Sequence, residues 1–196
     1  MEVIREWLDH GNSILTLPGW RDSGPQHWQT RWESKFPGIR RVQQHDWEKP
    51  VAADWVGVLQ QAVENASGHV ILVAHSLGCI AQHHWAIVHG SSARRIAGAL
   101  LVAPADPVRE GLSGHIQGFL PLSVRSLPYR SIVVASDDDP VCQPDRSAFL
   151  ANRWGSPLVM LNGEGHINAD SGLGDWDFGL RHLRRLIRSH YERETD

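Results

Sequence analysis

Short apolar runs rich in β-branched residues recur along the 196-residue chain, and segments with helical periodicity separate them. The runs are continuously apolar rather than alternating, which is typical of parallel strands that helices cover on both faces. Five runs are clear, at 13–17, 69–74, 96–103, 132–135 and 158–161, and a weaker one lies at 39–43. This pattern predicts a mostly parallel sheet of six strands.

The segments between these runs have the spacing of amphipathic helices. In the segment 51–66, for example, Trp55, Leu59 and Val63 recur at every fourth residue, as on one helix face. Helices are predicted over 25–36, 51–66, 77–89, 144–154 and 176–191. Strands and helices that alternate from end to end predict a single compact α/β domain over 1–196, with helices on both faces of the sheet. In such sheets, functional residues gather beyond the carboxyl ends of the strands.

Composition excludes several classes of function. The chain is 41% hydrophobic, which argues against disorder. Its 19 Lys and Arg are outnumbered by 22 Asp and Glu, so no nucleic-acid partner is expected. Two cysteines without a Cys-x-x-Cys pattern predict no disulfide framework, metal site or cofactor. No run approaches about 18 apolar residues and the N-terminus lacks the apolar region of a signal peptide, so we expect a cytoplasmic protein without membrane association.

The sharpest local signal is Ala74-His75-Ser76-Leu77-Gly78, which follows the most hydrophobic run and precedes a predicted helix. That context is typical of a nucleophile elbow, Gly-x-Ser-x-Gly, in which the serine lies on a tight strand-to-helix turn. Ala74 replaces the first glycine and adds only one methyl group. The pattern predicts Ser76 as a catalytic nucleophile, whereas His75 is interpreted as structural.

A serine nucleophile needs a base and an orienting acid, and on this fold they follow the serine in the order acid, then histidine. His166 lies beyond the last predicted strand, and three aspartates at 137–139 follow the strand before it. Asp139 is the predicted acid because Pro140 holds it in an extended conformation. The predicted catalytic residues are therefore Ser76, Asp139 and His166.

Other aspartates remain candidates for the acid. Asp138 is the first alternative, and Asp106, which follows an earlier strand, is the second. Asp137 is interpreted as part of a solvated turn. The sequence alone does not decide between Asp139 and Asp138.

Acyl transfer also needs two backbone N–H groups that stabilise the developing negative charge. One is expected from Leu77, the residue after the nucleophile, and the other from the loop after the first strand. That loop contains Leu17-Pro18-Gly19-Trp20. The N–H of Trp20 is the predicted second donor, and the alternative is that Pro18-Gly19 forms only a turn.

Several motifs resemble those of the YdeN-like serine hydrolases, which are small α/β-hydrolases related to retinoblastoma-binding protein nine. They fall in the family's order over nearly the whole chain. The resemblance implies a capless α/β-hydrolase with a Ser-Asp-His triad and an undefined substrate. The retinoblastoma-binding signature Leu-x-Cys-x-Glu is absent, because Ala81 stands in place of the glutamate, so no such partner is inferred. The matching segments are 17–20, 23–28 with Trp32, 47–50, the elbow, 139–140 and 165–176.

These observations predict a serine hydrolase that cleaves a small carboxylic ester, with a thioester or an amide as further options. Two alternative functions are those of a non-catalytic or regulatory binding protein on the same fold and of an acyltransferase or perhydrolase. The stretch 104–128, where larger relatives of this fold insert a cap, is long enough only for a short flap. A basic cluster on the last predicted helix is interpreted as a solvated face, with an anion-binding patch as the alternative; it comprises Arg181, His182, Arg184, Arg185 and Arg188.

Overall fold

The computed structural model describes residues 1–109, 112, 114–123 and 125–194. Its centre is a six-stranded sheet in the order β2-β1-β3-β4-β5-β6, in which every neighbouring pair is parallel. The predicted strands are confirmed to within two residues at each end. They are β1 (Ser13–Leu17), β2 (Ile39–Arg41), β3 (Val70–His75), β4 (Ile96–Val102), β5 (Ser131–Ser136) and β6 (Leu158–Leu161).

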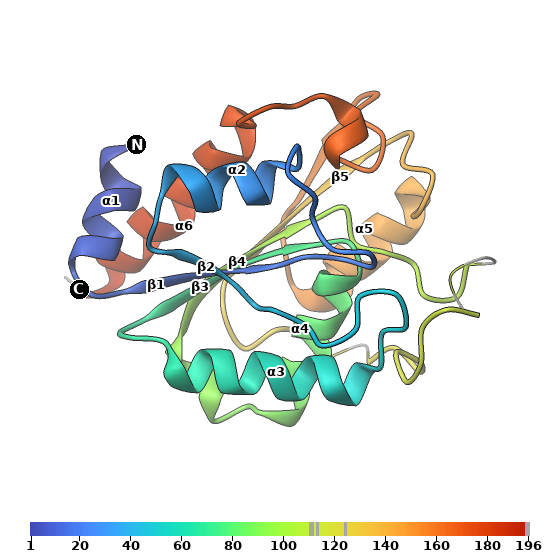
Figure 1. Ribbon diagram of the computed structural model, residues 1–196, viewed down its shortest axis with the longest axis horizontal. Coiled ribbons are helices and arrows are strands. Elements are labelled where there is room, and N and C mark those ends of the chain that lie inside the picture. The colour runs from blue at the N-terminus through green and yellow to red at the C-terminus, as the bar shows by residue number, and fades with distance from the viewer. Residues whose placement is uncertain (110–111, 113, 124, 195–196) are drawn as a thin grey trace.

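Helices cover both faces of this sheet, as the sequence predicts (Figure 1). On one face lie α1 (Glu2–Asp9), α2 (Trp28–Lys35) and α6 (Asp177–Glu194). On the other lie α3 (Ala52–Asn65), α4 (Leu77–Val88) and α5 (Pro144–Trp154). Two short 3₁₀ turns, Ser92–Arg95 and Ala169–Ser171, complete the regular structure of the described residues. Helix α1 is not among the predicted helices.

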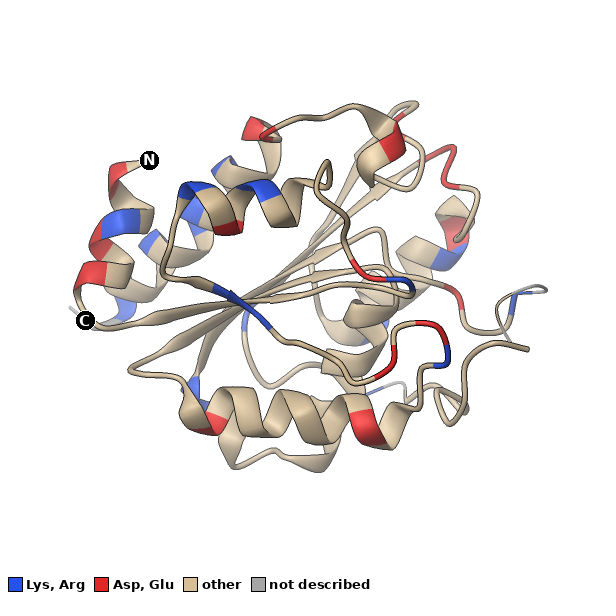
Figure 2. Ribbon diagram, viewed as in Figure 1, with Lys and Arg blue, Asp and Glu red and all other residues tan. Residues whose placement is uncertain are grey.

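The strands divide the apolar core into two layers, because successive side chains point to opposite faces. In β3, Leu72 and Ala74 pack with α3 and α4, whereas Ile71 and Val73 pack with α2 and α6. Strands β3 and β4 are buried over their whole length. Charged residues lie on helices, loops and the edge strand β2, and the other strands carry none (Figure 2). This explains the continuous apolar runs of the sequence.

The strand order places one end of the sheet in position for a site. The chain passes from β1 outward to β2 and then returns to β3 on the other side of β1. The connections after β1 and β3 therefore diverge at their carboxyl ends, which is where α/β sheets bind ligands. The loop after β1 carries Gly19 and the turn after β3 carries Ser76.

The stretch between β4 and β5 is the predicted flap. Its described residues form no helix or strand, apart from a bridge between Val51 and Gln117. Phe119 is buried against the α3 side of the core, and the ring of His115 stacks on Trp20 at 4.8 Å. The flap thus lies against the loop that follows β1. Among the described residues, no helix combines the length and apolar character that a membrane crossing requires.

Candidate active site

Ser76 lies on a strained turn between β3 and α4. Its φ is +54° and its ψ is −121°, a conformation that costs a residue other than glycine on the order of 1–3 kcal/mol. The backbone holds it there, because the N–H of Ser76 donates to the carbonyl of Val102 over 3.0 Å. Gly78 is required in the first turn of α4, since a Cβ there would lie 2.3 Å from the carbonyl oxygen of Leu17. Ala74 occupies a regular strand position, and its methyl group belongs to the core.

The loop after β1 packs directly against the serine. A Cβ built on Gly19 would lie 2.6 Å from Cβ of Ser76 and 3.1 Å from its Oγ, so only glycine fits. The next residue, Trp20, therefore begins beside Ser76. Leu77 is the first residue of α4, and the first N–H groups of a helix have no acceptor within it. In the described part of the chain, neither the N–H of Trp20 nor that of Leu77 donates a hydrogen bond.

His166 connects Ser76 to a buried carboxylate. Its Nε2 lies 2.9 Å from Oγ of Ser76, and its Nδ1 lies 2.9 and 3.0 Å from the two carboxylate oxygens of Asp139. The Asp139 side chain is fully buried. A carboxylate only accepts hydrogen bonds, so Nδ1 carries the proton and Nε2 is free to accept from the serine hydroxyl. This arrangement can activate a hydroxyl as a nucleophile.

The two neighbouring aspartates have other partners. Oδ1 of Asp138 accepts from the hydroxyl of Ser136 at 2.7 Å and from the N–H of Gly165 at 2.8 Å. These two hydrogen bonds, the one from Ser136 first, lower the pKa of Asp138. Asp137 accepts from the N–H of Gly163 at 2.9 Å. Both carboxylates therefore brace the loop that carries His166 rather than touching its ring.

Asp106, the remaining candidate acid, is also engaged elsewhere. Its carboxylate forms a salt bridge with Nε of Arg146 at 3.2 Å. Of the three candidate aspartates, Asp139 is the one that the structure brings to His166.

Two ring N–H groups hold the backbone of the histidine loop. Nε2 of His75 donates to the carbonyl of His166, and Nε1 of Trp28 donates to the carbonyl of Ile167, both at 2.9 Å. Ile167 has a φ of +48°, a true outlier for a β-branched residue. Gly165, on the other side of His166, also has a positive φ. The loop is therefore strained, and these donors fix its conformation. No sequence signal identified these contacts.

His75 and His27 form a neutral layer beneath His166. The ring of His75 lies 4.9 Å from that of His166 and 4.7 Å from that of His27, measured between centroids. Burial lowers the pKa of His27 to about 3, with smaller contributions from the charges of Arg41 and His166. Burial likewise places the pKa of His75 well below its usual value. Near neutral pH neither of these two rings therefore carries a charge.

This geometry agrees with a comparison of the sequence with known families. The profile of the family described as "Serine hydrolase" matches residues 14–185. The chain belongs to this serine hydrolase family. Within it, the chain is 25% identical to YdeN of Bacillus subtilis (strain 168) over 198 residues, an alignment that covers 93% of this chain and 97% of YdeN. The resemblance to YdeN-like proteins that the sequence motifs indicated is confirmed.

Two solved structures are similar to this serine hydrolase. The crystal structure of a YdeN-like protein from Pectobacterium atrosepticum superimposes with a TM-score of 0.83 at 31% identity, covering 97% of this chain and 99% of that one. The esterase RhEst1 from Rhodococcus sp. ECU1013 has a TM-score of 0.63 at 15% identity, covering 92% and 91%. The second similarity concerns the fold alone, and it identifies the compact α/β-hydrolase architecture.

No metal centre accompanies this site in the described part of the serine hydrolase. There, no group of three or more His, Cys, Asp or Glu side chains is arranged to hold a metal ion. Both cysteines are buried, and burial raises the pKa of the Cys142 thiol to about 11. A thiol with a raised pKa is a poor nucleophile at neutral pH.

Proposed function

We propose that this serine hydrolase cleaves small carboxylic esters through an acyl-enzyme on Ser76. The observation that carries the proposal is the unbroken hydrogen-bond chain from the hydroxyl of Ser76 through His166 to the buried carboxylate of Asp139. A hydroxyl is a weak nucleophile unless an adjacent base removes its proton. In these hydrogen bonds His166 is the base, and the carboxylate of Asp139 orients its ring.

The reaction proceeds in two halves. Nε2 of His166 takes the proton of Ser76 as Oγ attacks the ester carbonyl, and the N–H groups of Trp20 and Leu77 stabilise the oxyanion. The imidazolium then protonates the leaving alcohol, and the ester C–O bond breaks. In the second half, His166 removes a proton from water as the water oxygen attacks the acyl carbonyl. The bond between the acyl carbon and Oγ of Ser76 then breaks, the imidazolium returns the proton to Oγ, and a carboxylic acid is released. Asp139 keeps the imidazole in the correct tautomer and stabilises its cation.

The shape of the site favours small or exposed acyl groups. The described part of the stretch between β4 and β5 contributes no helix or strand above the site. Trp20 is half-buried, and its stacked partner His115 is exposed. A site without a cap domain does not enclose a long acyl chain. Esters are also the substrates named for the fold neighbour RhEst1, an esterase.

The direct test is hydrolysis of p-nitrophenyl esters that carry acyl chains of increasing length. We expect kcat/KM to be highest for short chains and to fall as the chain lengthens. A matched anilide and a matched thioester of the best acyl group distinguish the bond type. Failure to cleave any of these esters, with the protein folded and the Ser76→Ala variant as the background, would contradict the proposal.

The activity should depend on pH through a single ionisation. A base acts only in its neutral form, and histidine changes charge between about pH 5 and 8. We therefore expect kcat/KM to rise with pH over this range and then level off. His27 and His75 add no second step, because burial lowers the pKa of both rings, that of His27 to about 3. A pH–rate profile measured with a short-chain ester checks this; a flat profile would exclude His166 as the base.

His75 should act as a positioning residue. His75→Leu removes the donor to the carbonyl of His166 and leaves that carbonyl without its partner, which costs about 1–3 kcal/mol. The histidine then moves relative to Ser76, and we expect kcat to fall by at least tenfold with KM nearly unchanged. His75→Gln retains an N–H donor of similar reach and should recover most of kcat. Equal losses of kcat in the two variants would show that His75 serves packing alone.

A further inference from the structure

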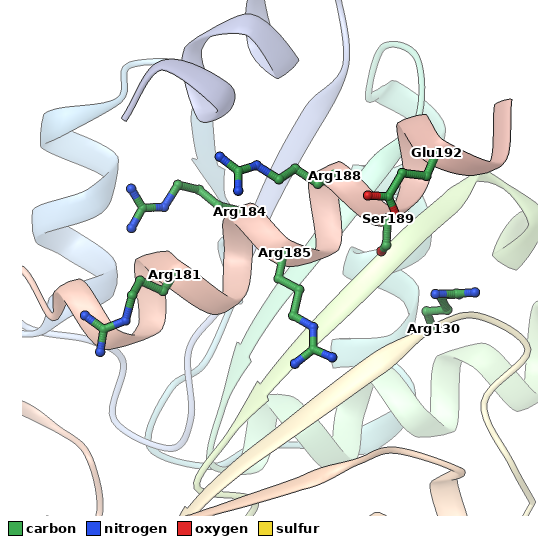
Figure 3. Close-up of a pocket in the computed structure, with 7 residues that line it drawn as sticks. All are labelled: Arg130, Arg181, Arg184, Arg185, Arg188, Ser189 and Glu192. Atoms are coloured by element: carbon green, nitrogen blue, oxygen red, sulfur yellow. The ribbon is translucent and has the colours of Figure 1, made fainter. Parts of the chain in front are cut away.

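A basic groove lies along the exposed side of α6, away from the catalytic residues. It has a volume of about 600 Å³. Four arginines of α6 line it, together with Arg130, which directly precedes β5, and with Ser189 and Glu192 of α6 (Figure 3). Arg185 points from the helix toward the sheet, on the side where Arg130 lies (Figure 3). The helix arginines are Arg181, Arg184, Arg185 and Arg188.

An apolar slot of about 290 Å³ continues this groove. The two cavities share Arg130, Arg185 and Ser189. The apolar side chains of the slot come from β5, β6 and α6, and they are Ile132, Val159 and Leu186 together with Pro157. The combined surface therefore has a charged rim on one side and an apolar floor on the other. Small-molecule sites in proteins have this size and this mixture of apolar lining and a few polar groups.

Positive charge predominates in the groove, where five arginines accompany a single carboxylate, that of Glu192. Arg21, Arg31, Arg41 and Arg146 each form a salt bridge with a carboxylate. None of the five groove arginines does so within the described part of the chain. The whole chain has a formal charge of −3, so the positive charge is local to this groove. Such a concentration of one sign attracts anions of the opposite sign.

The dipole of α6 does not account for the whole cluster. Cations stabilise a helix in its last turn, where α6 has Arg193, which does not line the groove. Arg181, however, lies in the second turn of a helix that begins at Asp177, and Arg130 is not on the helix at all. The dipole therefore gives no reason for these arginines to line one groove.

The groove and the catalytic residues lie at opposite ends of the sheet. Arg130 and Ser131 are at the amino end of β5, whereas Asp139 follows its carboxyl end; Pro157 precedes β6, whereas His166 follows it. A strand of six residues spans about 20 Å. The groove is therefore a separate site and not an extension of the ester-binding site.

We propose that this groove binds an amphiphilic anion, a carboxylate or phosphate monoester that carries a short apolar chain. The anionic group lies between Arg130 and Arg185, whose planar guanidinium groups form paired hydrogen bonds with carboxylate or phosphate oxygens. The apolar chain lies over Ile132 and Val159. The other arginines raise the local positive potential and strengthen the binding.

Calorimetric titration with octanoate, octyl phosphate, inorganic phosphate and 1-octanol tests this proposal. We expect saturable one-to-one binding of octanoate, octyl phosphate or both, and at least tenfold weaker binding of inorganic phosphate and 1-octanol. Preference between the two octyl anions identifies the head group as carboxylate or phosphate. Affinity should fall as the salt concentration rises.

Substitutions of groove residues test whether the anion binds there. Arg130→Gln and Arg185→Gln should each weaken binding of the preferred octyl anion at least tenfold, and Val159→Asn should weaken it while sparing inorganic phosphate. Arg153→Gln, on α5, removes the same charge from an exposed arginine that does not line the groove, and it should leave the affinity unchanged. Ester hydrolysis should be unaffected in Arg130→Gln, which also shows that the variant is folded. Binding that survives both groove variants, equal binding of 1-octanol, or no saturable binding at millimolar concentration would overturn the proposal.

Discussion

Ser76→Ala should lower kcat for ester hydrolysis by about 10⁶-fold, the loss typical of a serine hydrolase without its nucleophile. The substitution removes the oxygen that attacks the carbonyl, and no other hydroxyl in the described residues is bonded to His166. Stability should change little, because the side chain has one hydrogen bond, to His166, and the backbone bond to Val102 remains. Ester-hydrolysis assays with purified protein measure the loss of kcat, and labelling with a fluorophosphonate probe measures the loss of the reactive serine.

A matched control is Ser147→Ala, which removes a buried serine hydroxyl from α5. That hydroxyl donates a hydrogen bond to Sγ of Cys142 and has no hydrogen bond to Ser76, His166 or Asp139. This variant should therefore retain both hydrolysis and labelling. Labelling of Ser76→Ala at the rate of the unmodified protein would mean that the nucleophile lies elsewhere.

The sheet was predictable because its strands are buried on both faces. A segment such as 70–74, which is fully buried, must be apolar throughout, and this leaves a signal in the sequence itself. Helix α1 does have a helical pattern, because Ile4, Trp7 and Leu8 lie three and four residues apart. Its eight residues, however, are too few for that pattern to predict a helix by itself. Its stability comes from packing against α6 at the far end of the chain, and such a long-range contact cannot be read from a short segment.

The start of α2 shows a second limit. Pro25 suggested a helix that begins there, but α2 begins at Trp28. The N-cap is His27, whose Nδ1 accepts from the N–H of Gln29. Histidine is not among the preferred N-cap residues, so the true boundary had no recognisable pattern.

For the site, the sequence order of serine, acid and histidine was informative because the carboxyl ends of parallel strands meet at one edge. The sequence did not indicate in which direction the side chains of residues 137–139 point, because these directions depend on the backbone conformation of the turn. In the structure, Asp137 and Asp138 accept backbone N–H groups of the loop 163–165. The contacts of His75 and Trp28 with the histidine loop join segments that are far apart in the chain. Such contacts become visible only when the segments are folded together.

Asp139→Asn should reduce kcat by a factor on the order of 10⁴, the loss seen when the acid of a comparable triad becomes an amide. The amide offers Nδ1 of His166 an N–H₂ group or a neutral oxygen in place of two carboxylate oxygens at 2.9 and 3.0 Å. The imidazole then loses both the preference for its active tautomer and the stabilisation of its cation. Steady-state kinetics with a short-chain ester, at fixed pH and salt, measure this loss.

Asp138→Asn and Asp137→Asn are the matched controls, and each should lower kcat less than tenfold. All three substitutions remove one negative charge within the same turn, so their long-range electrostatic effects on His166 are similar. An asparagine at 138 also keeps a side-chain oxygen that can accept from Ser136 and Gly165, as Oδ1 of the carboxylate does. A large contrast between Asp139→Asn and its neighbours can therefore arise only from direct contact with the histidine ring. If Asp138→Asn were the crippling change and Asp139→Asn remained active, the acid would be Asp138, and the proposed roles of Ser76 and His166 would still stand.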